Sequence, residues 1–486
     1  MSDPRPRLTS STLDRLHKNV GAPGYDRRKV ASGVAHFGPG VFFRAHVAWH
    51  FDRLLSVDPR WGVSAISLRS GGLAQALGEQ DCLYTLAELA EPARFQIIGA
   101  LTEYVSGADD PARALDRLVD PSTKLVTLTV TEKGYCLDAG GALDWKHDDV
   151  RRDLAGGGLL YSVVGWLTES LWRRREAGHA PFTVLSCDNL SDNGPKLRRA
   201  VIQFASERRG PFFAQWIENE VRFPATMVDS ITPATDEALK RRVAEATGLA
   251  DEAPVQRESF TQWVIEDSLG PDAPDLARAG AILTGDVALY EQAKLRLLNG
   301  AHSALAYIGL LAGQETTRDA MAHRIIGPFV ERLMRNDSAA TLRAGGGLDA
   351  QAYVSALVER FLNPAVRHTL SKIASDGSQK LPYRILNPVR DLLRAGLSVD
   401  RPATVAAAWM RYAVGRQRAG EKLDDPLALQ LEKIAAACTD DAAGDTDRFL
   451  SLRSVFEADL AENPRFVAAV RAAYGRLVGD PLNLEA

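Results

Sequence analysis

The chain has 486 residues, of which 45% are hydrophobic and 25% are charged, a composition typical of globular proteins and unlike that of disordered or collagen-like chains. Its 58 Lys and Arg residues nearly balance 62 Asp and Glu residues, which leaves a formal net charge of -4. This balance gives no general attraction to nucleic acid or to anionic lipid, so the expected partner is a small molecule. At roughly 100 to 200 residues per domain, the length suits two to four domains, and we expect two.

The cysteines and the hydrophobic runs indicate the compartment. Cys82, Cys136, Cys187 and Cys438 are too widely spaced for a disulfide framework or a zinc knuckle. No apolar run approaches the ~20 residues that span a bilayer, and the first residues, MSDPRPRLTSSTLDRLHKN, lack the apolar core of a signal peptide. We therefore expect a cytoplasmic protein, either a monomer or a small homo-oligomer.

The first half of the chain alternates short β-branched runs with longer amphipathic stretches, which predicts a mainly parallel sheet covered by helices. Strands are predicted at residues 34–37, 63–67, 124–130 and 183–187. Helices are predicted between them at residues 44–56 and 161–177, and Gly178 ends the second.

The second half changes character near residue 286, after which the pattern is almost wholly helical. Helices are predicted at residues 286–311, 318–335, 350–362, 405–414, 427–437 and 466–478. Residues 270–280 and 439–447 are rich in Pro, Asp, Gly and Ala, which predicts surface connections. The expected architecture is a Rossmann-type dinucleotide-binding α/β domain over residues 1–285, followed by a mainly α-helical domain over residues 286–486.

The segment VAHFGPGVFFRAH places Gly38 and Gly40 directly after a predicted strand and before a helix. A dinucleotide fold needs glycine there, because the chain turns tightly and its backbone approaches the pyrophosphate at the helix N-terminus. Phe43 stands where the GxGxxG motif has its third glycine. A pair of glycines between a strand and a helix also occurs in ordinary turns. Arg44 either contacts a phosphate or is a solvated surface residue. The candidate cofactor residues of this segment are Phe37, Gly38, Gly40, Phe42 and Arg44.

The end of the second strand bears on the choice between NAD and NADP. A carboxylate is expected there, where it accepts hydrogen bonds from the adenosine ribose, but the sequence reads Ser67, Leu68, Arg69, Ser70. Arg69 beside Ser70 favours a 2′-phosphate and hence NADP, whereas a main-chain contact would still serve NAD. Both cofactors stay open.

The stretch LYEQAKLRLLNGAHSALAYIGLLAG carries three polar residues on a predicted helix. At about 100° per residue, Lys294, Asn299 and His302 fall at roughly 0°, 140° and 80°, within one broad arc. Gly300 lies inside this helix at a cost of about 1 kcal/mol relative to alanine, which indicates close approach of a ligand or of neighbouring backbone. The alternative is a buried helix whose polar side chains are satisfied locally.

Together the motifs resemble the mannitol dehydrogenase family, the polyol-specific long-chain dehydrogenases and reductases, which includes fructuronate reductases (D-mannonate oxidoreductases). The resemblance runs through FGPGVFFRAH, VTLTVTEKGY, VLSCDN, FPATMVDSITP, FTQWVIED, KLRLLNGAHS and DGSQKLP. It implies a metal-independent hydride transfer between a secondary alcohol and a nicotinamide cofactor. That cofactor is NAD or NADP, and the family favours NAD.

The resemblance also implies catalytic roles. Lys294 is the general base, which requires that burial lowers its pKa from about 10.4 towards neutrality. Asn299, with Asn189 of SCDN, holds the reacting oxygen as it gains negative charge. His302 orients the substrate or the base. Glu291, one turn before Lys294, relays the proton to solvent or is an exposed helix carboxylate.

Two further residues match family contacts, and a third is placed by its position after a strand. Asp229 in MVDS corresponds to a substrate-contacting aspartate, and Lys380 in DGSQKLP to a sugar-binding lysine. Glu132 in TEKGY follows a strand end, where open α/β sheets place their ligands, and is expected beside the nicotinamide. Glu132 and Asn189 are the remaining candidate cofactor residues.

The substrate signal is split between two branches of the family. Ser230 stands where many relatives have Arg, Lys372 where mannitol-active members often have Arg, and Thr261 where fructuronate reductases often have Arg. By contrast, TEKGYC, GSQKLPYR and WMRY resemble the fructuronate branch. Because a uronate needs a cation for its carboxylate, and Lys372, Lys380 and Arg384 lie in one short segment, the sequence favours D-mannonate and D-fructuronate. The alternative is D-mannitol and D-fructose.

The remaining expectations concern the place of the substrate, an alternative function and two individual residues. The substrate is expected in the cleft between the two domains. A non-catalytic sensor of cofactor or sugar is the alternative from another class, although a sensor has no need of a base. His36 is expected as a hydrogen-bonded core residue, and Cys187 is not expected to be a nucleophile.

Overall fold

The computed structural model describes residues 5–69 and 71–485. The chain divides into two compact units, Met1–Ala288 and Leu289–Ala486, where the sequence placed the boundary near residue 285. Within the described residues, the helices are all too short or too polar to cross a membrane.

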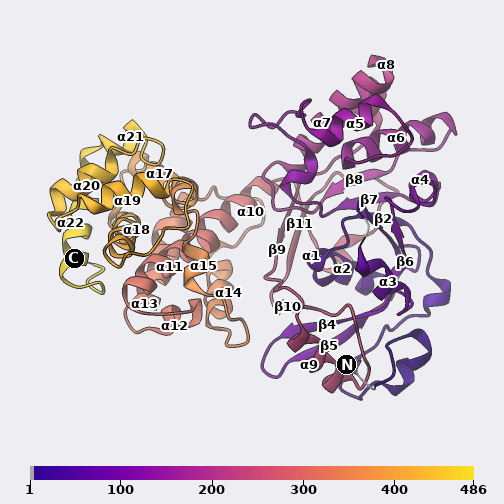
Figure 1. Cartoon of the computed structure of the whole chain (residues 1–486), viewed down its shortest axis with the longest axis horizontal. Coiled ribbons are helices and arrows are strands. Elements are labelled where there is room, and N and C mark those ends of the chain that lie inside the picture. Colours follow the sequence, from indigo (N-terminus) through magenta and orange to yellow (C-terminus); the bar gives the residue numbers. More distant parts are fainter. Residues whose placement is uncertain (1–4, 70, 486) are drawn as a thin grey trace. The chain divides into compact units, whose positions relative to one another are not determined.

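A parallel sheet of five strands forms the centre of the first unit (Figure 1). Its order is β6-β3-β2-β7-β8, and every pairing in it is parallel. The chain moves from β2 to β3 and β6 on one side, and later to β7 and β8 on the other. The change of direction between β2 and β7 is a topological switch point, where doubly wound folds bind ligands. The strands are β2 (Val34–Phe37), β3 (Val63–Ser67), β6 (Leu101–Ser106), β7 (Leu125–Leu128) and β8 (Thr183–Ser186).

Helices cover both faces of this sheet because successive side chains of a strand point to opposite faces. Val34 packs with the helices α1 and α2, whereas Ala35 and Phe37 pack with α4, α6 and α7. The predicted helix 44–56 is instead two helices that meet at His46. The helices of the unit are α1 (Val41–Ala45), α2 (Val47–Leu55), α3 (Gly72–Gly78), α4 (Pro111–Val119), α5 (Asp148–Ala155), α6 (Val163–Glu176), α7 (Asn193–Arg209), α8 (Pro211–Glu220) and α9 (Glu237–Thr247).

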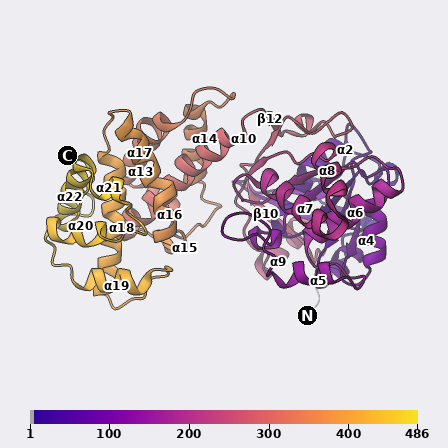
Figure 2. The same ribbon diagram turned by 90° about the horizontal axis from the view of Figure 1, so that it is seen from above.

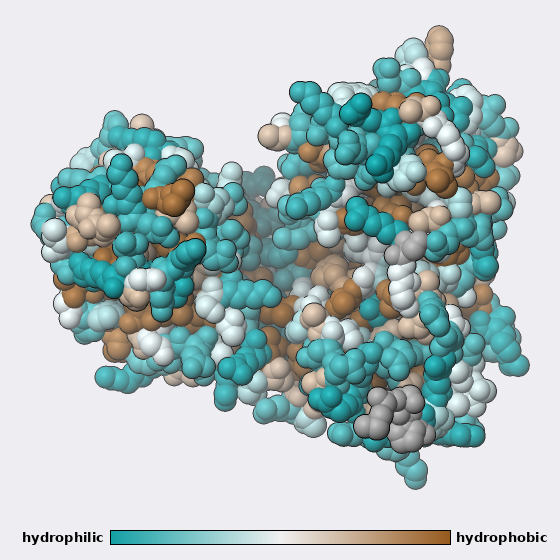
Figure 3. Space-filling model, viewed as in Figure 1, coloured by the Kyte–Doolittle hydropathy of each residue, from teal (hydrophilic) through white to brown (hydrophobic). Residues whose placement is uncertain are grey.

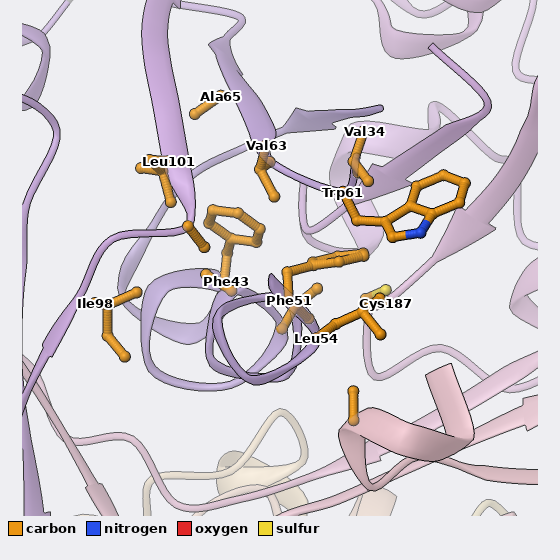
Figure 4. Packing of buried hydrophobic residues seen from close by; sticks show 14 of the residues in the cluster. Val34, Phe43, Phe51, Leu54, Trp61, Val63, Ala65, Ile98, Leu101 and Cys187 are labelled. Atoms are coloured by element: carbon orange, nitrogen blue, oxygen red, sulfur yellow. The ribbon is translucent and has the colours of Figure 1, made fainter. Parts of the chain in front are cut away.

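Two aromatic rings fill the space between the sheet and the first two helices. Phe43 of α1 and Phe51 of α2 point towards Val34 and Val63 on the strands (Figure 4). Both rings are fully buried, and each contributes about 1.5–3 kcal/mol relative to an exposed side chain. This packing fixes the position of α1 and so of the turn that precedes it.

Two smaller sheets complete the first unit, and the sequence analysis predicted neither. One has the order β1-β5-β4-β10 and the other β12-β11-β9. Their strands are β1 (Val20–Gly21), β4 (Tyr84–Leu89), β5 (Arg94–Ile98), β9 (Thr226–Asp229), β10 (Val255–Glu258), β11 (Gln262–Glu266) and β12 (Ile282–Thr284).

The second unit is helical, as predicted (Figures 1 and 2). The long helix α18 packs against α11 and α22 in its interior. Three π-helical segments, Lys294–Asn299, Leu333–Ser338 and Pro382–Leu386, interrupt the α-helices. The helices are α10 (Val287–Ala293), α11 (Gly300–Leu311), α12 (Thr317–Ala322), α13 (Ile326–Arg332), α14 (Ala350–Leu362), α15 (Leu370–Ala374), α16 (Gly377–Leu381), α17 (Asn387–Arg394), α18 (Asp400–Arg418), α19 (Ala428–Ala436), α20 (Ala442–Leu450), α21 (Ala458–Ala461) and α22 (Pro464–Gly479).

Two predictions for this unit were wrong in detail. The predicted helix 318–335 is broken between α12 and α13. The predicted connection 439–447 is largely helix α20, because the carboxylate of Asp441 accepts a hydrogen bond from the Gly444 amide and caps the helix. Hydrophilic side chains cover most of the face shown in Figure 3, with smaller hydrophobic patches between them, as on ordinary protein surfaces.

Candidate active site

The glycine turn between β2 and α1 stands at the topological switch point. Gly38 has φ +84°, and a Cβ there would lie 2.2 Å from the carbonyl oxygen of Thr129, which directly follows β7. Gly40 is exposed, and the nearest atom to a Cβ on it would be 3.9 Å away. One glycine is therefore required by the fold, while the other leaves the backbone open to a ligand. This geometry fits the diphosphate of a dinucleotide.

A buried hydrogen-bond chain supports the turn from behind. The Thr129 hydroxyl donates to the Gly38 carbonyl at 2.7 Å, and His36 Nε2 lies 3.1 Å from that hydroxyl. His36 Nδ1 lies 2.7 Å from the Thr127 hydroxyl. Burial lowers the pKa of His36 to about 3, so the ring is neutral and Nε2 carries the proton that Thr129 accepts. The expectation of a hydrogen-bonded core histidine is confirmed.

Arg44 requires a correction, because it does not face a phosphate. Arg44 is only 4% exposed. Its guanidinium donates a hydrogen bond to the Ala253 carbonyl and lies 5.5 Å from the centre of the Tyr84 ring. The guanidinium joins α1 to the four-stranded sheet, and a cation held inside the unit cannot reach a bound diphosphate. Arg44 is therefore a structural residue and neither of the two alternatives that the sequence left open.

The other cofactor candidates lie at the strand ends. The Phe37 ring is fully buried, 6.1 Å from the Trp166 ring, so this residue offers a ligand its backbone alone. Phe42 is half-buried. Arg69 is exposed and follows Leu68, the first residue after β3, in the region where an adenosine ribose would bind. Ser70 lies outside the described residues.

Glu132 and Asn189 follow the carboxyl ends of the adjacent strands β7 and β8, and both are exposed. Between them Asp188 is 9% exposed and accepts hydrogen bonds from the segment after β7. Burial raises the pKa of this carboxyl group. The sequence analysis missed Asp188, although its place beside Asn189 in SCDN was a signal. Cys187, next to it, is a buried thiol whose pKa burial raises well above its usual value, which argues against a nucleophile.

Asp229 belongs to a different sheet. It is the last residue of β9, is buried, and pairs in register with Gln262 of β11. The hydroxyl of the adjacent Ser230 donates to the Phe260 carbonyl at 2.9 Å. The short side chain of Ser230 is therefore bound to the chain's own backbone.

In the second unit, α10, a π-helical segment and α11 follow one another and carry Lys294, Asn299 and His302. The π-helix spans Lys294–Asn299, and its i to i+5 hydrogen bonds set Asn299 one turn above Lys294. The α-helical geometry assumed from the sequence separates the two by roughly 140°, so the π-turn brings them closer to one face. Glu291, Lys294 and Asn299 are half-buried.

Gly300 marks the close approach of a neighbouring backbone, as expected. A Cβ on it would lie 3.2 Å from the Arg384 carbonyl oxygen. The Arg384 guanidinium donates to the Asn299 carbonyl at 3.4 Å and to the Ser303 hydroxyl at 3.3 Å. Within the part of the chain that the structure describes, this half-buried cation has no carboxylate at ion-pair distance. Burial lowers its pKa.

The other two cations of this region differ in their surroundings. Lys380 is half-buried, and its ammonium donates to the carbonyls of Ser375 at 2.6 Å and Ile373 at 3.4 Å. Burial and the nearby Arg384 lower the pKa of Lys380. Lys372 is exposed on α15. Of these three cations, Arg384 is the one whose side chain is hydrogen-bonded to Asn299 and Ser303 within the described residues.

His302 is 8% exposed, and its ring centre lies 5.0 Å from that of Phe361 and 5.1 Å from that of His368. Burial lowers its pKa well below the usual value, so the imidazole is neutral. No group among the described residues bonds its Nε2. A neutral imidazole with a buried, unbonded nitrogen suits contact with a substrate hydroxyl.

Comparison with known proteins agrees with these features. Residues 32–277 match the model of the mannitol dehydrogenase Rossmann domain, and residues 286–478 match the model of the mannitol dehydrogenase C-terminal domain. The chain is 40% identical over 467 residues to a D-mannonate oxidoreductase of Escherichia coli (strain K12), which covers 94% of this chain and 96% of that protein.

Two solved structures are similar over almost the whole chain. A D-sorbitol dehydrogenase in substrate-free form has a TM-score of 0.91 at 32% identity, covering 98% of this chain and 99% of that one. A Pseudomonas fluorescens mannitol 2-dehydrogenase in ternary complex with NAD and D-mannitol has a TM-score of 0.78 at 33% identity, covering 98% of each chain. The chain therefore belongs to the mannitol dehydrogenase family and is an NAD(P)-dependent oxidoreductase that acts on a secondary alcohol.

Proposed function

We propose that this oxidoreductase interconverts D-mannonate and D-fructuronate, with Arg384 binding the substrate carboxylate. Arg384 carries the proposal because it is a half-buried cation without a described carboxylate partner, and it lies against the backbone of Asn299. A guanidinium binds a carboxylate through two parallel hydrogen bonds. The 40% identity to a protein named D-mannonate oxidoreductase supports the same substrate.

Residues of the second unit would do the proton chemistry. In the oxidising direction, Lys294 takes the proton of the reacting hydroxyl, while Asn299, with Asn189 of the first unit, donates hydrogen bonds to the oxygen as it gains charge. The C–H bond breaks and its electron pair leaves with the hydride, so the alcohol becomes a ketone. In reduction Lys294 returns the proton. The neutral His302 orients a substrate hydroxyl through Nε2, and Glu291 passes the proton to solvent.

Residues of the first unit would hold the cofactor and part of the substrate. The backbone of Gly38 and Gly40 would bind the diphosphate, with Phe42 beside it and Arg69 at the ribose. The nicotinamide cofactor, when bound, accepts the hydride in oxidation and supplies it in reduction. Glu132 would line the nicotinamide side, and Asp229 would contact a substrate hydroxyl.

A second candidate is the interconversion of D-mannitol and D-fructose. Thr261 favours it, because fructuronate reductases often have Arg at that position, and the similar structure with bound D-mannitol supports it. These neutral substrates need hydroxyl partners and no cation. The sensor alternative is not retained for a member of an oxidoreductase family.

The substitution Arg384→Gln separates the two candidates. Removal of charged hydrogen bonds worth about 1.5–3 kcal/mol predicts that kcat/KM for fructuronate falls roughly 10- to 150-fold, mainly through KM. The value for fructose should change less than about threefold. Arg394→Gln is the matched control, because Arg394 is exposed on α17 and pairs with Asp391. Equal losses on both sugars would show that Arg384 only supports its helix and would refute its role in carboxylate binding.

A further inference from the structure

We propose that Asp188 is a positioning residue that sets Asn189 and the segment after β7 for the hydride-transfer step. This inference rests on the proposed function, because it acts through the role given above to Asn189. Asp188 itself is buried and is not proposed to touch the substrate or the cofactor.

The carboxylate of Asp188 holds the neighbouring segment by three hydrogen bonds. Its Oδ1 accepts from the Thr131 amide at 2.9 Å, and its Oδ2 accepts from the Val130 amide at 3.0 Å. The Tyr135 hydroxyl donates to Oδ2 at 2.6 Å. One carboxylate thus joins the ends of β7 and β8, the two strands that lead to Glu132 and Asn189.

The segment that it holds is strained. Thr131 has φ +66°, a conformation that is an outlier for a β-branched residue. Such a conformation persists only where the surroundings determine it, and the bond from the Thr131 amide to Asp188 is such a constraint. Without this acceptor, the backbone that leads into Glu132 should relax to another conformation.

The glycine turn has a separate support. Thr129 precedes the clamped residues, and its hydroxyl donates to the Gly38 carbonyl with His36 behind it. None of these bonds involves Asp188. Loss of the Asp188 carboxylate should therefore slow the chemical step and leave the affinity for the cofactor nearly unchanged.

A purely structural role is the competing explanation, and Asp153 provides the matched control. Asp153 is 2% exposed and accepts bonds from the amides of Tyr161 and Ser162 and from the Ser162 hydroxyl, at 2.8, 2.9 and 2.6 Å. Burial raises the pKa of its carboxyl group as well. Asp153 belongs to α5 and holds the residues just before α6 rather than the strand ends. It is therefore also buried and has the same kind of partners, without the proposed role.

The test compares Asp188→Asn with Asp153→Asn in the full chain, on any substrate that the wild type converts. For Asp188→Asn, kcat should fall about 10- to 100-fold, the range for misplaced groups, while the Kd of NADH changes less than about threefold. With reduced cofactor deuterated at the transferred position, the isotope effect on kcat should rise, because hydride transfer becomes slower than product release. Asp153→Asn should lower the melting temperature and leave kcat and the isotope effect unchanged.

Tyr135→Phe is a milder variant that keeps both backbone bonds and should lower kcat about threefold. It allows the test even where Asp188→Asn does not fold. The inference is overturned where the Asp188 variant loses only stability, as the Asp153 variant does, or where Tyr135→Phe has wild-type kcat and isotope effect.

Asn189→Ala distinguishes a failure of this inference from a failure of the proposed function. Wild-type kcat in Asn189→Ala would refute the role proposed for Asn189, and this inference with it. An impaired Asn189→Ala beside a fully active Asp188→Asn would refute the inference alone.

Discussion

Substitution of Gly38 or of Gly40 by alanine distinguishes a glycine that the fold requires from a glycine that cofactor binding requires. Gly38 has φ +84°, and its Cβ would lie 2.2 Å from the Thr129 carbonyl oxygen. Gly40 has φ -72°, and its Cβ would meet no atom closer than 3.9 Å. The two substitutions add the same methyl group two residues apart, so their effects should differ in kind.

The structure sets the size of each effect. For Gly38→Ala, the left-handed conformation costs about 1–2 kcal/mol and the clash about 1–3 kcal/mol more, so the unfolding free energy of the first unit should fall by about 2–5 kcal/mol. Gly40→Ala should leave it unchanged or raise it by about 0.4–1 kcal/mol. Its methyl group would instead occupy the place of the diphosphate, and the loss of charged hydrogen bonds worth about 1.5–3 kcal/mol weakens NADH binding roughly 10- to 150-fold.

Urea unfolding and fluorescence titration with NADH measure the two effects on the same purified variants. The reasoning predicts an unstable Gly38→Ala, and a stable Gly40→Ala that binds NADH poorly. Wild-type affinity in Gly40→Ala would refute the placement of the diphosphate at this turn. A wild-type urea midpoint in Gly38→Ala would refute the close contact with Thr129.

Two further predictions concern the base and the acid stability. Lys294→Ala should lower kcat about 100- to 10,000-fold, the usual contribution of a general base. Lys433→Ala replaces an exposed lysine of α19 and should leave kcat unchanged, so it serves as the control. Turnover by Lys294→Ala at the rate of this control would show that Lys294 is not the general base. Burial lowers the pKa of His50 to about 4 against about 6.5 in the unfolded chain. As the pH falls, the unfolded chain binds a proton at His50 before the folded protein does. The free energy of unfolding therefore falls between pH 6.5 and pH 4, by about 1.4 kcal/mol per pH unit. His50→Gln should flatten this dependence in urea unfolding between pH 7 and pH 5, and parallel curves for variant and wild type would contradict it.

The local hydrophobic pattern predicted those strands and helices whose buried residues can be recognised from their own sequence. The strands β2 and β3 and the helix α14 have the predicted bounds. The small sheets escaped prediction because polar residues occupy buried positions in them: Arg257 and Glu258 of β10 are both buried, and strand patterns assign such residues to the surface. Tertiary packing, not periodicity, determines these strands.

Prediction of the candidate site was limited in the same way, by contacts between residues that are distant in the sequence. Gly38, Gly40 and the lysine helix were proposed from their spacing, and Gly300 was expected to meet either a ligand or another backbone. The π-turn at Lys294–Asn299 was not predicted, because the spacing was interpreted with α-helical geometry. Arg44 was misjudged because its partners, Tyr84 and Ala253, are distant in sequence and belong to unpredicted strands or their flanks. Asp188 was missed because its role consists of bonds to a segment more than fifty residues away.

The most direct test of the account is a steady-state comparison of wild-type kcat/KM for fructuronate and fructose, each with NADH and with NADPH. We expect turnover with a nicotinamide cofactor, and a higher kcat/KM for fructuronate than for fructose with whichever cofactor is preferred. A higher value for fructose would contradict the proposed substrate and favour the mannitol reaction. No change in nicotinamide absorbance with either sugar, across a panel of polyols and aldonates, would contradict the proposed chemistry as a whole.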